Sequence, residues 1–431
     1  MAPPKKKADA KRLYIRKLES LIDAAKQLNT TFDLDKLLSI ILDHATKNLN
    51  AARGTIYLID ERSQELWSKV VKGTGLVEIR LPIGTGISGT VAETGKTINL
   101  KAVSKDKRFY SAIDKKSGFH TRTMLCRPMR DRNGVIIGVF QIINKKRGVF
   151  NRNDELFLDA FSEHASLAIE NARLYQADLE HARVDKEIQI AAEMQQQLFP
   201  KEKIQIPSYE LSAMVQPCAA IGGDSYDIIP LKDGKYAITM ADVCGKGIPA
   251  ALLVSTLHAL LRVFLQYPIE LLELVRKLNT LVYNNSPAER FITFFIMIFD
   301  PVHHTFTYVN AGHNPPFLFR KNRNEINELM ASGLPLGMVE EQQFETHLIE
   351  LHQGDTLVVY TDGVTEAANR TLQQYSEEKL RECVLKNIDT TAETIKECIV
   401  RDVRGFVGNN PMSDDLTLLV LKRDLETSAT R

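Results

Sequence analysis

The stretch from Asn153 to Phe199 constrains the fold most, because it contains neither proline nor glycine. Apolar or small side chains recur in it at steps of three and four residues, the spacing of a helix with one apolar seam. The seam consists of Phe157, Phe161, Ala165, Ala168, Ala172, Tyr175, Leu179, Ala182, Ile188, Ala191 and Leu198. Its phase slips near Asp185 and Lys186, which would locally unwind or overwind a coiled coil. We expect a long helix between two halves of the chain. The helix either forms a homodimer as a coiled coil or packs on its own domain.

Composition limits the classes of partner and location. The 431 residues are 44% hydrophobic and 25% charged, which allows two separate cores. The 55 basic and 54 acidic residues give a formal net charge of +1, so we expect no nucleic-acid partner. No apolar run has the length of a membrane span, and the first 20 residues lack the apolar core of a signal peptide. The five cysteines include no CxxC pair, which is typical of reduced thiols. We therefore expect a cytoplasmic protein without a membrane contact.

The first half has the signals of a mixed domain. Residues 10–30 read as a helix, and a second helix follows with Asp33 as its N-cap. Strands are predicted at Thr55–Ile59 and Val135–Ile143. The glycine-rich segment Gly84–Gly89 lacks the lysine and the serine or threonine of a P-loop, so we interpret it as a turn that enters a short helix.

The second half alternates blocks of strands with blocks of helices, which favours an α+β sandwich over parallel βαβ units. Strands are predicted at Tyr236–Met240, Phe294–Phe299, Phe306–Val309, Pro316–Phe319, Asp355–Tyr360 and Leu416–Lys422. Helices are predicted near Pro249–Tyr267, Glu270–Asn284, Glu377–Lys386 and Thr391–Phe406.

Four short motifs of this half place aspartates beside small residues at strand ends or tight turns. They contain Asp224, Asp242, Asp362 and the pair Asp414–Asp415. A single aspartate beside glycine is usually a turn residue. Four such groups in one domain, without matching arginines, instead favour a divalent cation, because a buried carboxylate needs a partner. Oxygen ligands suit Mg²⁺ or Mn²⁺, and two such ions can activate a water for hydrolysis.

The same motifs resemble the SpoIIE/RsbU-like branch of the PPM metal-dependent protein phosphatases. The matching strings, in order, are IGGDSYDI (221–228), ADVCGKGIPAALL (241–253), NAGHNPP (310–316), GLPLGM (333–338), YTDGVTEA (360–367) and SDDLTLL (413–419). The resemblance covers the chain from about residue 188 onward. It implies an α-β-β-α sandwich with two Mn²⁺ or Mg²⁺ ions, and hydrolysis of phosphoserine or phosphothreonine in proteins.

The resemblance also implies roles for single residues. Asp242 would bridge the two ions, and the Val243 carbonyl would bind one of them. Asp362 and Asp414 would bind the other ion, and Asp224 would act directly or through water. Asp415 is the weaker candidate of its pair. Cys244 stands where animal members carry a histidine, so the general acid is unassigned. His313 and Asn314 either stabilise a turn or face the substrate.

Residues 20–175 resemble a GAF domain. Asn144-Lys145, Phe150 and Asp154-Glu155 reproduce the NKxnFxxxDE motif of GAF domains that bind cyclic nucleotides. The resemblance implies cAMP or cGMP as a regulatory ligand, with Arg53 and Thr55 beside the purine and Thr121 and Thr123 beside the ribose or phosphate. A Lys145–Asp154 ion pair would hold a strand near the pocket. The open alternatives are another small molecule, or no ligand at all.

Together these features predict a basic tail (1–19), a GAF sensor domain (20–175), a helical linker (176–200) and a phosphatase domain (201–431). The predicted substrate is a phosphorylated anti-sigma-factor antagonist of a bacterial signalling pathway. One alternative is a non-catalytic phosphoprotein-binding regulator, which retention of all the aspartates disfavours. A cyclic-nucleotide phosphodiesterase is disfavoured because the ten histidines lack metal-ligand spacing.

Overall fold

The computed structural model describes residues 30–60, 62–68, 79–109, 114, 119–200, 204–287, 289–323 and 325–424. The chain divides into two compact units, Met1–Arg183 and Val184–Arg431, and each is described by itself. The basic tail and the helix predicted for residues 10–30 lie outside the described residues, apart from residue 30. Within the described residues, no helix combines the length and the apolar character needed to cross a membrane.

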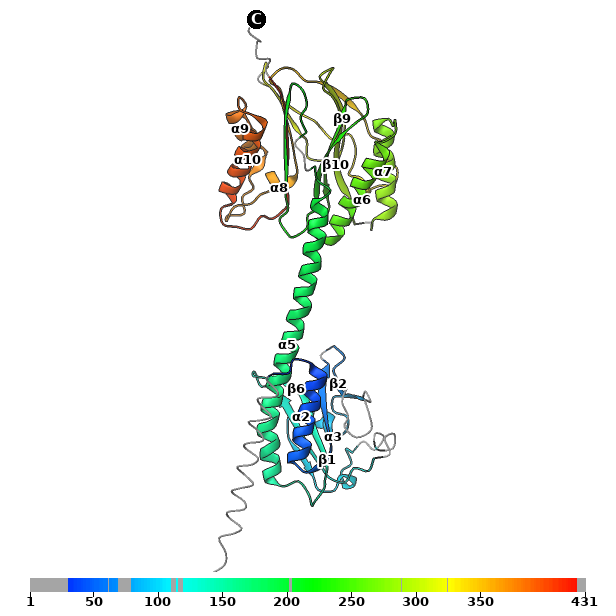
Figure 1. Ribbon diagram of the computed structural model, residues 1–431, viewed down its shortest axis with the longest axis vertical. Coiled ribbons are helices and arrows are strands. Elements are labelled where there is room, and N and C mark those ends of the chain that lie inside the picture. The colour runs from blue at the N-terminus through cyan, green and yellow to red at the C-terminus, as the bar shows by residue number, and fades with distance from the viewer. Residues whose placement is uncertain are drawn as a thin grey trace, which may run out of the picture. The chain divides into compact units, whose positions relative to one another are not determined.

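The first unit, drawn in blue and cyan in Figure 1, contains a six-stranded sheet. Its strand order is β3-β2-β1-β6-β5-β4, and every pairing is antiparallel. The strands are β1 (Ala51–Asp60), β2 (Glu65–Ser68), β3 (Ile79–Pro82), β4 (Ile98–Leu100), β5 (Met124–Arg130) and β6 (Ile136–Lys145). Helix α2 (Leu34–Asn48) and the beginning of α5 pack on one face of this sheet. Helix α3 (Gly86–Thr94) packs on the other face, and a short 3-10 turn, Val103–Lys105, lies near it in sequence.

Local signals of the sequence explain these helices. The Asp33 side chain accepts a hydrogen bond from the Lys36 amide (3.1 Å), which satisfies a free N–H of the first turn of α2. Asp33 thus caps α2 as predicted, and Leu37, Leu38, Ile41 and Leu42 of this helix are buried. The predicted turn into α3 contains Gly84, and α3 begins at Gly86; both glycines have positive φ. Both predictions are confirmed.

Helix α5 (Arg152–Gln196) runs for 45 residues without a break. The first five residues of the predicted seam, Phe157 to Ala172, belong to the hydrophobic core of the first unit. Their assignment to an intermolecular seam is therefore wrong, because the α2 helix and the sheet already cover them. Further along the helix, Tyr175 and Leu179 are 44% and 54% exposed. The α-helix is continuous through the predicted phase slip near Asp185 and Lys186.

The second unit is a sandwich of two five-stranded antiparallel sheets, with the orders β14-β11-β10-β9-β8 and β13-β12-β15-β16-β7. Its strands are β7 (Tyr209–Gln216), β8 (Asp224–Pro230), β9 (Tyr236–Val243), β10 (Ile292–Asp300), β11 (Thr305–Ala311), β12 (Phe317–Arg320), β13 (Glu325–Glu328), β14 (His347–Glu350), β15 (Thr356–Tyr360) and β16 (Leu416–Arg423). Its helices are α6 (Ile248–Phe264), α7 (Leu271–Asn285), α8 (Asp362–Thr365), α9 (Ser376–Asn387) and α10 (Ala392–Val407).

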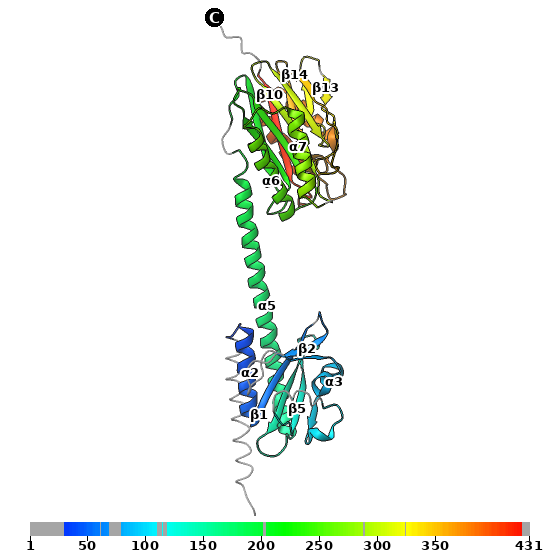
Figure 2. The same ribbon diagram turned by 90° about the vertical axis from the view of Figure 1, so that its right-hand side faces the viewer.

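Helices cover both outer faces of the sandwich. Helices α6 and α7 pack on the sheet that contains β10, as Figure 2 shows, and α9 and α10 pack on the sheet that contains β16. A third cluster of apolar side chains fills the space between the sheets. The α-β-β-α architecture implied by the family resemblance is confirmed.

The alternation of side chains along β9 determines where the polar groups lie. Ile238 and Met240 point into the core between the sheets, whereas Ala241 and Val243 pack beneath α6 and α7. Because successive side chains of a strand point to opposite faces, Asp242 lies on the face between the sheets. The Asp242 carboxylate, near the end of β9, thus lies at one end of the sandwich interior.

Candidate functional site

Three polar residues form a row across neighbouring strands at this end of the sandwich. Asp224, the first residue of β8, lies directly opposite Asp242 of β9, and Asp242 lies directly opposite Thr293 of β10. Residues directly opposite on antiparallel strands share one face of the sheet. The row therefore faces the second sheet.

The second sheet contributes two hydroxyl groups to this row. The Asp224 side chain is 3% exposed, and its Oδ2 accepts hydrogen bonds from Thr361 Oγ1 (2.7 Å) and Thr417 Oγ1 (2.6 Å). Burial and the neighbouring charge of Asp242 raise the pKa of Asp224 well above its usual value. Two hydroxyl donors thus fix one carboxylate oxygen of Asp224 between the sheets.

Neighbouring carboxylates raise the pKa values of two further aspartates of the site. Burial, together with the charges of Asp362 and Asp414, raises the pKa of Asp242 to about 7. Asp362 is the first residue of α8, and burial and the charge of Asp414 raise its pKa too. Asp242 thus interacts with the carboxylates of Asp224, Asp362 and Asp414, and these oxygen donors fit hard divalent cations such as Mn²⁺ or Mg²⁺. The structure thus brings together Asp224, Asp242, Asp362 and Asp414, the four aspartates predicted as catalytic.

The loop Gly222–Asp224 packs closely against the end of β9. The Val243 amide donates to the Gly223 carbonyl (3.2 Å), and a Cβ at Gly223 would lie 3.1 Å from the Val243 carbonyl oxygen. Glycine at 223 therefore lets the loop approach this carbonyl, which the sequence predicts as a metal ligand.

Asp415 has partners of a different kind. Its carboxylate is buried and accepts hydrogen bonds from the amides of Cys218 (2.8 Å), Gly223 (2.6 Å) and Asp224 (3.3 Å). Among the described residues, ligand atoms of Cys218, Asp414 and Asp415 lie within 4.8 Å of one another. Because these three backbone amides donate hydrogen bonds to its carboxylate, Asp415 shapes the loop that carries Asp224.

Sequence reasoning missed a cation at this site. Lys246 Nζ lies 2.9 Å from Asp414 Oδ2 and also donates to the Ser413 carbonyl. The expectation that the motifs have no cationic partner is therefore wrong for Lys246. Both side chains of the ion pair are nearly half exposed, so solvent screens it. The GKG sequence of the β9–α6 loop was the signal available for finding it.

The buried environment of His313 favours the turn role proposed for it. Its imidazole is 2% exposed, and its Nδ1 lies 2.9 Å from Thr293 Oγ1. The Asn310 side chain bonds both the His313 amide (2.8 Å) and the His313 carbonyl (3.1 Å). Burial lowers the pKa of His313 to about 4, so the ring is neutral at pH 7. Asn314 follows it in the loop and is only partly buried.

A pocket in the first unit contains three of the predicted ligand residues. Arg53, Thr55 and Thr121 line it. The Arg53 guanidinium is buried and lies 4.3 Å from the centre of the Phe119 ring. Thr121 donates through its amide and its hydroxyl to the Asp114 carboxylate, at 2.8 Å each. The other lining residues are Asp114, Tyr57, Ile79, Leu81, Thr85, Gly86, Ile87, Ser88, Phe109, Phe119, Met124, Gln141 and Ile143.

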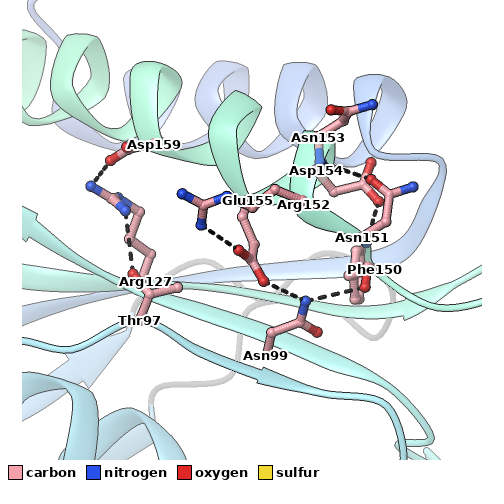
Figure 3. A network of polar contacts seen from close by, with 10 residues as sticks. All are labelled: Thr97, Asn99, Arg127, Phe150, Asn151, Arg152, Asn153, Asp154, Glu155 and Asp159. Atoms are coloured by element: carbon pink, nitrogen blue, oxygen red, sulfur yellow. Dashed lines mark hydrogen bonds and ion pairs between the residues drawn. The ribbon is translucent and has the colours of Figure 1, made fainter.

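The NKxnFxxxDE motif instead lies among structural contacts outside this lining. Lys145 forms an ion pair with Asp154, whose side chain is 3% exposed and also accepts from the Asn151 amide (2.9 Å). Figure 3 shows Asn99 of β4 donating to Glu155 (2.8 Å) and to the Phe150 carbonyl (3.1 Å). These contacts attach the start of α5 to the edge of the sheet.

The remaining motif residue, Asn144, binds the two residues that precede β5, next to the pocket. Its side-chain oxygen accepts from the amides of Arg122 (2.6 Å) and Thr123 (3.2 Å). The Thr123 hydroxyl accepts from the Lys145 amide (3.1 Å). Thr123 is therefore placed beside the motif, and it is Thr121 that reaches the pocket.

Comparison with known proteins matches each unit to a family. A model of the family "Stage II sporulation protein E (SpoIIE)" matches residues 232–424, and the GAF domain model matches residues 33–169. The phosphoserine phosphatase RsbU of Bacillus subtilis is 32% identical over 243 residues, which cover 56% of this chain and 71% of RsbU. The solved SiaA-PP2C domain of Pseudomonas aeruginosa covers 57% of this chain and 99% of its own, with a TM-score of 0.50 and 17% identity, and so supports the fold.

The first unit also matches part of a larger enzyme. The probable 3',5'-cyclic phosphodiesterase pde-5 of Caenorhabditis elegans is 33% identical over 174 residues, which cover 37% of this chain. The match spans only 24% of the length of that protein.

Proposed function

This chain belongs to the SpoIIE/RsbU-like family of serine/threonine phosphatases and carries a GAF domain before the phosphatase domain, and from this premise we propose that it removes phosphate from phosphoserine or phosphothreonine of a partner protein. The observation that carries the proposal is the cluster of Asp224, Asp242, Asp362 and Asp414 at one end of the sandwich. Isolated carboxylates in such a cluster would repel one another, which supports a site built for cations.

We infer the role of each residue in metal binding from its position. Asp242 lies between Asp224 and the charges of Asp362 and Asp414, which supports it as the ligand shared by two ions. The Val243 carbonyl would bind one ion, and Asp415 would shape the loop of Asp224. Two Mn²⁺ or Mg²⁺ ions at such a site supply an activated water and neutralise phosphoryl charge. The general acid stays unassigned.

The test is hydrolysis of a phosphate ester and of a phosphoserine peptide with and without Mn²⁺ or Mg²⁺. We expect metal-dependent turnover that Asp242→Ala and Asp362→Ala each reduce by at least a hundredfold. The matched control is Asp233→Ala, which removes an exposed carboxylate from the β8–β9 turn. Turnover that is absent, or that persists in both variants, would contradict the proposal. Phosphopeptide binding without turnover would favour the non-catalytic regulator.

For the physiological substrate we propose a phosphorylated anti-sigma-factor antagonist. The support is the likeness to RsbU over most of the length of that protein. The test is release of phosphate from a phosphorylated antagonist by the full chain, compared with an unrelated phosphoserine protein. Equal rates on the two proteins would argue against this substrate.

For the GAF domain we propose cAMP or cGMP as the regulatory ligand. The pocket supports this, because it combines a buried Arg53, hydroxyl and amide groups, and the first residues of α3, where free N–H groups favour an anion. The match to a region of pde-5 adds to this support. Calorimetry of the full chain with each nucleotide tests it, and phosphatase rates with and without nucleotide give the sign of regulation. No heat with either nucleotide would exclude both ligands.

We also propose that the chain forms a homodimer through the part of α5 beyond Ala172. The support is a set of exposed apolar side chains that share one side of the helix: Tyr175, Leu179, Ile190 and Met194. Apolar side chains exposed at helical spacing on a long helix are typical of coiled coils.

A further inference from the structure

The NAGHNPP motif is so far accounted for only as a turn, yet its histidine contacts the row of polar residues at the phosphatase site. Asp224, Asp242 and Thr293 are consecutive partners across β8, β9 and β10. Thr293 thus occupies the next position after Asp242 on the face between the sheets. Ile292 and Phe294 on either side of it are fully buried in the apolar core beneath α6 and α7, whereas Thr293 is only partly buried.

The hydroxyl of Thr293 is held from one side. Its Oγ1 lies 2.9 Å from His313 Nδ1. The backbone of His313 is itself fixed. The fully buried Asn310 side chain forms hydrogen bonds with the backbone amide and the backbone carbonyl of His313, and it also donates to the Leu329 carbonyl (3.0 Å). The buried imidazole, which is carried on this fixed backbone, limits the rotation of the threonine hydroxyl.

The hydroxyl retains unused hydrogen-bonding capacity. A threonine hydroxyl offers one donor and two acceptor positions, and the imidazole occupies one of these. Directly opposite residues of an antiparallel pair have Cβ atoms roughly 4.5–5.5 Å apart, so the Thr293 hydroxyl and the Asp242 carboxylate are close enough for a single water to bridge them. The partial exposure of Thr293 is consistent with such a water.

We propose that Thr293 is a positioning residue of the phosphatase site: held by His313, its hydroxyl bonds through water to the Asp242 carboxylate and fixes the orientation of that carboxylate toward the cations. This inference rests on the proposed function of the aspartate cluster. It gives the histidine of NAGHNPP a purpose beyond the turn, namely to orient a hydroxyl that supports a metal ligand. Residues that orient metal ligands typically change metal affinity or activity by 10- to 100-fold when they are replaced.

The central test replaces the hydroxyl by a methyl group of equal size. In the full chain, Thr293→Val is expected to weaken Mn²⁺ binding, measured by calorimetry or by electron paramagnetic resonance, about tenfold. We expect kcat for p-nitrophenyl phosphate to fall by a similar factor, with KM within about twofold of the wild type. Thr293→Ser restores the hydroxyl and is expected to recover most of the Mn²⁺ affinity.

The histidine is tested by the same measurements. An asparagine at 313 can still present a polar atom near the position of Nδ1, whereas phenylalanine cannot. We therefore expect His313→Phe to reproduce the loss of Thr293→Val, and His313→Asn to retain more affinity. Because both substitutions remove one interaction, the double variant with valine at 293 and phenylalanine at 313 should be no worse than Thr293→Val alone.

The matched control is Thr356→Val on β15. Thr356 is fully buried, faces the α9–α10 side, and has a hydroxyl without a hydrogen-bond partner among the residues that the structure describes. Its replacement should leave Mn²⁺ affinity unchanged. A folded Thr293→Val variant with wild-type Mn²⁺ affinity and kcat would overturn the proposal. If that variant does not fold, equal affinities of His313→Asn and His313→Phe would overturn it. A wild type that binds Mn²⁺ without hydrolysing esters would contradict the phosphatase proposal, while the Mn²⁺ titrations would still decide the role of Thr293.

Discussion

At the scale of single residues, neighbouring aspartates of this chain acquire different roles from their partners. The Asp415 carboxylate is satisfied by three backbone amides, whereas the Asp242 carboxylate lies among other carboxylates. The same side chain therefore acts as a loop constraint at one position and as a candidate cation ligand at another. Adjacent residues such as Asp414 and Asp415 cannot be told apart by sequence spacing alone.

The charge crowding predicts a pH dependence of the metal-free protein. The folded pKa of Asp242, about 7, lies above the ordinary value of 3.8, so the folded state binds a proton more tightly than the unfolded state. Its contribution to stability is complete below about pH 4 and is lost as the pH rises through 7. In EDTA, we therefore expect the unfolding temperature of the phosphatase unit to fall between pH 5 and pH 8.

Two comparisons check this prediction. Asp242→Asn removes the titrating group, so its unfolding temperature in EDTA should depend less on pH. Mn²⁺ should restore stability most at pH 8, where the ligands are deprotonated. An unfolding temperature in EDTA that rises over this pH range in the wild type relative to Asp242→Asn would contradict the assignment.

Gly363 supplies a second residue-scale prediction. A Cβ at this position of α8 would collide with the backbone carbonyl of Asp415, so the helix turn that carries Asp362 would have to move. We expect Gly363→Ala to destabilise the unit by roughly 1–3 kcal/mol and to weaken Mn²⁺ binding, as measured by denaturant unfolding and calorimetry. Gly405→Ala is the control, because Gly405 lies in α10 with open space around it. This substitution should raise the free energy of unfolding by about 0.5–1 kcal/mol.

The candidate site could be predicted only in part from the sequence. The four aspartates were found because each stands in a local motif beside glycine or small residues. Lys246 was present in one of these motifs, but its pairing with Asp414 depends on a contact across 168 positions of the chain. Thr293 carried no local signal, because its place beside Asp242 is set by the register of β9 and β10.

At the scale of secondary-structure elements, α5 shows where periodicity reaches its limit. Steps of three and four residues identify a helix with an apolar stripe, but the partner of the stripe is a tertiary property. From Phe157 to Ala172 that partner is the core of the first unit. Short strands such as β4 and β13 were not predicted either, since three or four residues are too few to establish an alternating pattern.

The junction between β6 and α5 predicts a purely structural effect. Lys145→Met leaves the buried Asp154 carboxylate without its cation, which should cost about 3–5 kcal/mol in the free energy of unfolding of the first unit. The double replacement Lys145→Met and Asp154→Leu should recover most of this loss. Denaturant unfolding followed by circular dichroism measures both.

Lys146→Met provides the matched control for this pair, because the adjacent Lys146 is exposed and should contribute little. A loss of cyclic-nucleotide binding by a Lys145→Met protein that remains fully stable would show that the motif contacts ligand, contrary to its position outside the pocket lining.

At the scale of the whole molecule, the proposed homodimer predicts a change of mass in solution. Leu179→Glu places a charge on the exposed continuation of the predicted seam, and we expect the dimer to dissociate. Light scattering coupled to size-exclusion chromatography measures the mass. Ala177→Glu introduces the same charge about 160° around the helix from Leu179 and should leave the mass unchanged. A monomeric wild type, or equal masses of the two variants, would rule out this interface.

The order of strands in the second unit has a consequence for its biosynthesis. Strand β16 lies between β15 and β7, and Leu416 pairs with Gln216, 200 residues earlier. Two donors to Asp224, the Thr417 hydroxyl and the Thr361 hydroxyl, also come from late in the chain. At ribosomal rates of about 5–20 residues per second, β16 is synthesised roughly 10–40 s after β7. The nascent chain can thus complete its GAF domain well before the phosphatase domain has all the strands of its active site.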